Sequence, residues 1–202
     1  MTRLKILPTL FSMALLAGAV LLPAKADTWD KKTVVTFGAP VEIPGKVLLP
    51  GTYVFKLLDS AGNRNIVQIF NKDETQFMGT VLAIPDYRMK PADKPLITFE
   101  ERASGAPPAI KAWYYPGDNY GARFVYPHNR AVELAKRTHD SVPSMSNDMA
   151  KHMTTQATSK SDDSIQAMEH TNVIAVKPSG EEVELELIIL PAPDNSGGAD
   201  RK

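Results

Sequence analysis

The chain has 202 residues, with 23 basic and 23 acidic side chains and no cysteine. A formal charge of zero excludes the strongly basic surface that binding to nucleic acid requires. The lack of cysteine excludes disulfides, thiolate metal sites and lipid attachment through an N-terminal cysteine. Sixteen prolines and twelve glycines are spread between short apolar runs, which is typical of an all-β protein with many turns.

Residues 1–26 have the organisation of a secretory signal peptide. Arg3 and Lys5 supply a positive start, residues 6–22 form an apolar run, and the small residues Ala24 and Ala26 fit a cleavage site. We expect cleavage after Ala26 and a periplasmic or extracellular protein without stable membrane insertion. A retained membrane anchor is the alternative, because the run is near the lower limit for spanning a bilayer. Cleavage would leave 20 basic and 23 acidic side chains, a net charge of −3.

The clearest strand pattern lies at residues 51–71. Tyr53, Phe55 and Leu57 alternate with more polar neighbours, as on a strand with one buried face. A polar turn that contains Gly62 follows, and the chain then returns as a second strand. This segment therefore predicts a β-hairpin.

Further strands are predicted along most of the chain. They cover residues 33–37, 41–43, 47–49, 76–84, 96–101, 110–115, 123–126, 173–176 and 181–190. The run at 76–84 is apolar on both faces, which indicates a central strand. We predict an antiparallel β-sandwich for residues 27–136, with a partly closed barrel as the alternative.

The spacing of Ala131, Leu134 and Ala135 predicts one short amphipathic helix within residues 130–138. Residues 137–170 show no hydrophobic period and predict a flexible, disordered linker, with transient helix at 147–154. Residues 171–190 then predict a C-terminal β-hairpin, and we expect residues 191–202 to be a disordered tail.

Six of the fifteen aromatic side chains lie within residues 113–126. Aromatic faces beside short polar side chains suit a sugar or peptide ligand. The candidate ligand-binding residues are Trp113, Tyr115, Asp118, Asn119 and Tyr120. Core packing is the alternative, since strand alternation directs about half of such rings inward whatever the function.

The sequence offers no evident catalytic set. Of the four histidines, only His128 lies beside predicted regular structure, and no nucleophile-elbow serine motif accompanies it. An enzyme would need a carboxylate within hydrogen-bond reach of His128 in a pocket. We therefore expect a non-enzymatic protein without a cofactor.

A second possible function rests on the predicted linker. Met145, Met149, His152 and Met153 would lie along one side of a helix, and thioether with imidazole is a ligand set that suits Cu(I). The alternative to a binding role at the cell envelope is therefore periplasmic handling of Cu(I) or Ag(I).

Several segments resemble a family of exported, uncharacterised bacterial proteins. The segments are WDKKTVVTF, VEIPGKVLLPGTYVFKLLDS, NIVQIF, AIPDYR, ITFEER, KAWYYPGDNYG, FVYP and RAVELAK, within residues 28–136, and more weakly AVKPSGEEVEL. The resemblance implies export and a β-rich domain, and no activity. We therefore expect a role at the cell envelope, with an unknown glycan or protein as the partner.

Overall fold

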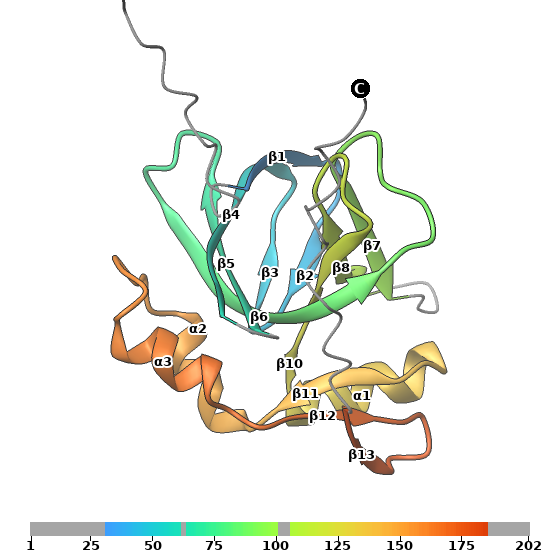
Figure 1. Ribbon diagram of the computed structural model, residues 1–202. Coiled ribbons are helices and arrows are strands. Elements are labelled where there is room, and N and C mark those ends of the chain that lie inside the picture. The colour runs from blue at the N-terminus through green and yellow to red at the C-terminus, as the bar shows by residue number, and fades with distance from the viewer. Residues whose placement is uncertain (1–30, 62–63, 101–105, 186–202) are drawn as a thin grey trace, which may run out of the picture.

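The computed structural model describes residues 31–61, 64–100 and 106–185 (Figure 1). The predicted signal peptide, the predicted tail and the end of the predicted C-terminal hairpin lie outside these ranges. Within them, no helix combines the length and the apolar character needed to cross a membrane.

In the described residues, nine strands form one large sheet. They are β1 Lys32–Phe37, β2 Val41–Ile43, β3 Lys46–Leu48, β4 Gly51–Ala61, β5 Arg64–Asn71, β6 Phe77–Tyr87, β7 Leu96–Glu100, β8 Ala109–Tyr114 and β9 Tyr120–Phe124. Their order is β1-β4-β5-β6-β9-β8-β2-β3, and β7 also pairs with β8. The sheet is mixed, because β2 runs parallel to β8.

A smaller sheet and short helices follow in the chain. The sheet contains β10 Tyr126–Pro127, β11 Val142–Met145, β12 Val173–Val176 and β13 Glu182–Glu184, in that order, with β10 parallel to β11. The helices are α1 His128–Thr138, the 3-10 helix η1 Asn147–Met149, α2 Ala150–Met153 and α3 Asp163–Glu169. Figure 1 places the small sheet and α1 below one end of the large sheet.

The predicted β-rich class is confirmed, although pairing is mixed and not purely antiparallel. The predicted helix is also confirmed and begins at His128, directly after Pro127. It ends at Thr138, and the C-cap residue His139 adopts the left-handed conformation with φ 58°. Helices η1 and α2 lie within residues 147–154, where the sequence predicts transient helix, and α3 is additional to the predicted helices.

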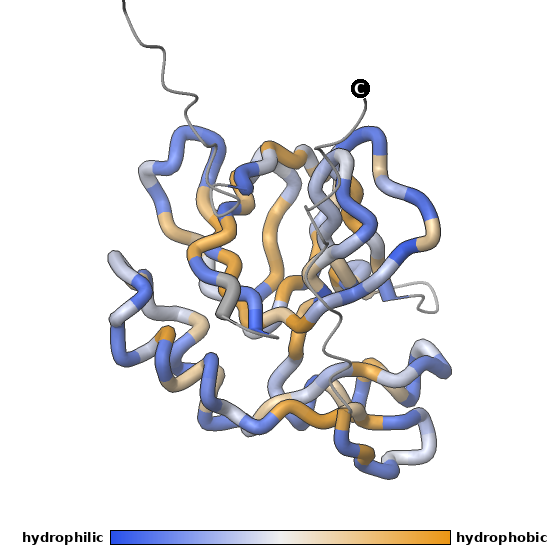
Figure 2. Tube along the Cα trace, viewed as in Figure 1, coloured by the Kyte–Doolittle hydropathy of each residue, from blue (hydrophilic) through white to orange (hydrophobic). Residues whose placement is uncertain are grey.

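An aromatic cluster fills the interior of the large sheet. The ring centroid of Phe55 lies 6.1 Å from that of Trp113, 6.3 Å from that of Phe124 and 6.4 Å from that of Phe37. Tyr53 and Phe55 are both buried, as their alternation predicts. Figure 2 shows hydrophobic residues along the strands around this interior and hydrophilic residues along the loops at one end.

The large sheet curls until β1 faces β7 and β8. The Trp113 indole Nε1 donates a hydrogen bond of 3.2 Å to Thr33 Oγ1, although four strands separate β1 from β8 in the sheet order. The rings of Phe37 and Phe99 meet edge to face, 6.4 Å apart. Among the described residues β1 pairs by its backbone with β4 alone, so these side chains form the seam.

Strands β5 and β6 are buried on both faces, as the sequence predicts for residues 76–84. Val81 and Ala83 face the aromatic interior, whereas Leu82 and Ile84 face a second apolar cluster. That second cluster lies on the outer side of the sheet, where the chain after residue 142 returns (Figure 1). Strands β5 and β6 therefore separate the two apolar clusters and contribute side chains to both.

The prediction of a flexible linker is wrong, because residues 142–170 contain β11, η1, α2 and α3. Apolar side chains from these elements are buried against Ile66, Leu82 and Ile84. They are Met145, Met153, Ile165 and Met168. Each element has at most seven residues, so no repeat is long enough to register as a hydrophobic period.

Side-chain hydrogen bonds also hold this segment to the sheet. Gln68 Nε2 on β5 donates to the carbonyl oxygen of Ala157 at 2.9 Å, and Thr80 Oγ1 on β6 donates to that of Thr155 at 3.1 Å. Gln68 and Thr80 are buried, so each bond satisfies a group that water does not reach. The polar side chains of Gln68 and Thr80 therefore mark where residues 142–170 contact the otherwise apolar strands β5 and β6.

Strands β12 and β13 form an antiparallel hairpin inside the range predicted for one. In the described part of the chain this hairpin extends the small sheet through β11 and does not pair with the large sheet.

Helix α1 is fixed to the large sheet by an ion pair. The guanidinium of Arg130 donates to both carboxylate oxygens of Glu42 on β2, each at 2.6 Å. Glu42 is largely buried, and the charge-assisted bonds raise the pKa of Arg130. This bidentate contact sets the position of the first turn of α1, and with it that of His128.

Two carboxyl groups meet where α3 docks on β4. Burial raises the pKa of Glu169, and the charge of Asp59 and a hydrogen bond to it raise the pKa further. Lys160 Nζ lies 3.2 Å from Asp59 Oδ1 and offsets part of this repulsion. The contact between α3 and β4 is therefore strongest while Glu169 holds its proton.

Replacement of Thr33 by Val should destabilise the protein by about 1–3 kcal/mol, because the buried indole N–H of Trp113 loses its acceptor. Urea unfolding followed by tryptophan fluorescence measures this free energy. Thr36→Val is the matched control, since Thr36 lies on the same strand but is exposed. Equal losses in both variants would contradict a role for the seam hydrogen bond.

The raised pKa of Glu169 predicts a pH-dependent stability. Its contribution is fully present below the ordinary glutamate pKa of about 4.3 and is lost as pH rises through the raised value. Glu169→Gln should therefore gain unfolding free energy relative to the wild type between pH 4 and pH 7. Asp73→Asn, an exposed turn carboxylate, serves as the control and should follow the wild type in urea titrations at each pH.

Candidate functional site

An exposed pair of tyrosines lies where β6 ends and β9 begins. Tyr87 and Tyr120 are direct partners in the register of these strands, and their ring centroids are 5.4 Å apart. Their exposed fractions are 54% and 42%, and the neighbouring Met89 is 90% exposed. We refer to Tyr87, Arg88, Met89 and Tyr120 as the tyrosine surface. Large apolar groups gathered in one exposed place are a feature of binding sites.

Two loops that hydrogen-bond to each other support the tyrosine surface. Arg88 N donates to the carbonyl oxygen of Asn119 at 2.8 Å, and Gly117 N donates to that of Ala92 at 2.8 Å. Gly117 has a φ of 83°, which a residue with a side chain adopts only with strain. Backbone hydrogen bonds therefore hold the two loops together beside the strand ends that carry the tyrosine rings.

Tyr114 ties the same region to the interior. Its hydroxyl donates to Asp86 Oδ2 at 2.7 Å, and the guanidinium of Arg88 lies over its ring at 5.1 Å. Burial, and then the hydrogen bond to Asp86, raises the pKa of the Tyr114 phenol. The phenol therefore stays protonated and acts as a structural donor.

The predicted binding residues are distributed between core and surface. Tyr120 is exposed, as a binding residue must be. Tyr115 is half-buried with Lys31 Nζ 5.8 Å from its ring centre, and the Asp118 carboxylate forms an ion pair with the same lysine. Asn119 is half-buried, and its backbone carbonyl joins the two loops.

The structure contradicts a ligand-binding role for Trp113. Its side chain is buried in the aromatic interior, and its only polar atom already donates to Thr33. Position 113 lies on the inner face of β8, which agrees with the alternative prediction of core packing. Tyr87 was missed because Pro85 suggested the end of a strand, whereas β6 continues to Tyr87 opposite β9.

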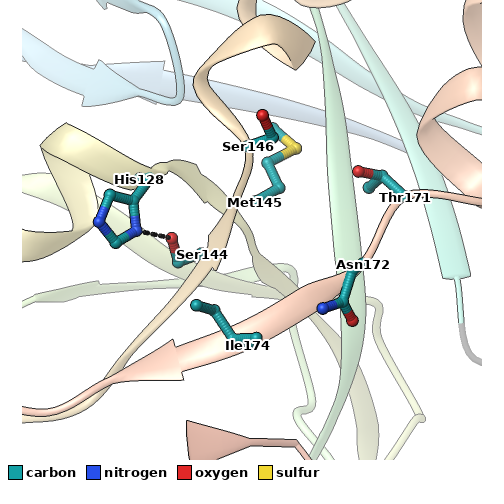
Figure 3. Close-up of a pocket in the computed structure, with 7 residues that line it drawn as sticks. All are labelled: His128, Ser144, Met145, Ser146, Thr171, Asn172 and Ile174. Carbon is teal, nitrogen blue, oxygen red and sulfur yellow. Dashed lines mark hydrogen bonds between the residues drawn. The ribbon is translucent and has the colours of Figure 1, made fainter. Parts of the chain in front are cut away.

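A second candidate site is a pocket of about 200 Å³ at the small sheet (Figure 3). It is lined by His128, Ser144, Met145, Ser146, Thr171, Asn172 and Ile174. Ser144 and Met145 are buried, whereas Ser146 and Asn172 are exposed. The pocket therefore opens to solvent between the latter two residues.

His128 lies between a hydroxyl and a carboxylate at this pocket. Its Nδ1 is 3.4 Å from Ser144 Oγ, the contact drawn in Figure 3, and its Nε2 is 3.5 Å from Glu182 Oε1. His128 is a candidate from the sequence alone, whereas Ser144 falls in the predicted linker and Glu182 in the predicted C-terminal hairpin. Only the folded small sheet brings the three residues together.

Three of the four proposed metal ligands belong to the second apolar cluster or pack against it. Met145 and Met153 are buried in the second apolar cluster, and Met149 packs against it from outside. His152 on α2 is half-buried, beside methionines whose burial core packing explains. In the ranges that the structure describes, no three His, Cys, Asp or Glu side chains gather where they could hold a metal ion.

Comparison of the chain with family models, with curated proteins and with solved structures finds no match. The resemblance to exported bacterial proteins stays a prediction.

The close packing under the tyrosine surface predicts that Gly121→Ala is destabilising. A Cβ at Gly121 would lie 2.5 Å from the Tyr114 ring and 2.9 Å from the carbonyl oxygen of Trp113. Neither group is free to move, so we expect a loss of about 1–3 kcal/mol in thermal or urea unfolding. At Gly38 nothing lies within 4 Å of the added atom, and Gly38→Ala should have little effect.

Proposed function

We propose that this chain is an exported β-rich protein that binds a partner at the cell envelope through the tyrosine surface. The observation that carries the proposal is the exposed Tyr87–Tyr120 ring pair, at the paired ends of β6 and β9 and beside two loops that hydrogen-bond to each other. The proposal includes delivery to the periplasm or beyond by the signal peptide predicted in residues 1–26.

A glycan is the partner that this chemistry favours. Two adjacent aromatic faces offer apolar area for the carbon face of sugar rings, and polar groups at their edge offer hydrogen bonds. Arg88 adjoins the rings, and Asn119 and Asp118 lie in the supporting loop. A protein partner commonly buries about 800 Å² on each side, which far exceeds the area of two rings and a methionine.

The proposal also includes the degree to which the large sheet closes on itself. A partly closed barrel, the alternative to the predicted sandwich, is supported by the contacts of β1 with β7 and β8. In that arrangement the aromatic core is enclosed by strands, and the tyrosine surface lies at one rim. Binding sites at the mouths of β-barrels are common.

Binding to an array of envelope glycans, followed by calorimetry on any glycan that binds, tests the proposal. We expect Tyr87→Ala and Tyr120→Ala each to lower the affinity about tenfold, the equivalent of about 1.4 kcal/mol of lost stacking. Leu49→Ala is the control, because Leu49 is an exposed apolar residue away from the two tyrosine-bearing strands. No binding by the wild type, or equal binding by both tyrosine variants, would refute a glycan site here.

A further inference from the structure

The pocket in Figure 3 combines side chains that the proposed binding function does not use. We propose that Ser144, His128 and Glu182 form a nucleophile, base and carboxylate set, and that the pocket accepts short-chain acyl esters. This activity is independent of the tyrosine surface, which lies on β6 and β9 of the large sheet.

The topology explains why these three residues meet. Ser144 lies on β11, between β10 and β12, and is the register partner of Ile174. Val142 and Val176 are also partners, and Glu182 pairs with Val176 across β12 and β13. Because partners and residues two apart share one face of a sheet, all of these side chains lie on the same side.

Helix α1 packs on that side and brings His128 to Ser144. The buried residues Leu134 of α1, Val142 of β11 and Val176 of β12 belong to one apolar cluster. His128 is the first residue of α1 and follows β10 directly, so it stands beside the neighbouring strand β11. The Arg130–Glu42 ion pair fixes the same turn from the other side.

The geometry assigns one tautomer to His128. If Nε2 carries the proton and points to Glu182, then Nδ1 has a free lone pair to accept the proton of Ser144. The distances of 3.4 and 3.5 Å are longer than in a reacting complex, and such contacts commonly tighten when substrate binds. Glu182 acts as a positioning residue, because it orients His128 without touching the substrate.

The reaction that this set can carry out is acyl transfer to water. Ser144 Oγ forms a bond to the ester carbonyl carbon while its proton passes to His128 Nδ1, and the alkoxide leaves with that proton as an alcohol. Water then attacks the acyl-serine, gives a proton to Nδ1, and the carboxylic acid departs as Ser144 recovers its proton. No oxidant or metal is required.

The size and walls of the pocket define the substrate class. A volume of about 200 Å³ is smaller than the roughly 300 Å³ at which pockets for drug-sized ligands begin. Ile174, on the same face as Ser144, provides an apolar wall for a short chain, and the Asn172 amide can donate to a carbonyl oxygen. Acetyl and propionyl esters therefore fit, whereas long acyl chains do not.

Labelling of the full chain with a fluorophosphonate, followed by peptide mapping, tests the nucleophile. We expect one adduct on Ser144, which Ser144→Ala removes and which Ser161→Ala retains, since Ser161 is an exposed serine outside the pocket. Peptide mapping of the adduct on the wild type identifies the nucleophile even if a variant folds poorly. No adduct, or an adduct elsewhere only, would overturn the proposal.

Hydrolysis of p-nitrophenyl acetate and octanoate tests the remaining roles. Acetate should be cleaved faster than octanoate, and Ser144→Ala and His128→Gln should each lower kcat at least a hundredfold. Glu182→Gln should lower kcat with KM unchanged, because it acts through His128, whereas a purely structural role would leave kcat unchanged. Equal rates for the wild type and Ser144→Ala would refute catalysis by this set.

Discussion

The fold depends on the enclosure of Phe55 by strands from distant parts of the large sheet. Phe37 comes from β1 at one end, and Trp113 comes from β8, which four intervening strands separate from β1 in the sheet order. Neither half of the sheet can bury this ring alone, so the apolar area gained on folding is obtained only when the sheet curls. The hydrogen bond between Trp113 and Thr33 then fixes how β1 and β8 face each other.

The curled sheet also explains the second layer. Curling buries one face of β5 and β6, but Ile66, Leu82 and Ile84 still point outward. Residues 142–170 cover them with methionines, whose flexible side chains fit an irregular surface. The same segment contributes β11 and so builds the small sheet, which holds the pocket residues Ser144 and Ile174. The same segment therefore covers the outer face of the large sheet and supplies residues of the pocket.

Local patterns were predictable from the sequence, whereas arrangements that depend on distant residues were not. Alternation at Tyr53 and Phe55 reports the buried face directly, because it needs only the two-residue period of a strand. The short elements of residues 142–170 have no such period and were mistaken for a linker. For the candidate sites, Tyr120 and His128 were found by residue type. Their partners Tyr87 and Ser144 depend on strand pairing that the sequence alone does not specify.

The side-chain seam has a consequence for how the chain acquires its structure. Thr33 and Trp113 are 80 positions apart, so the seam forms only after nearly half of the chain has been ordered. In the part of the chain that the structure describes, β1 pairs by its backbone with β4 alone, and the side-chain seam does not add a backbone partner along its other edge. A strand edge without a backbone partner can pair with the equivalent strand of another molecule, so we expect exchange of β1 between two nascent copies as a route of misassembly.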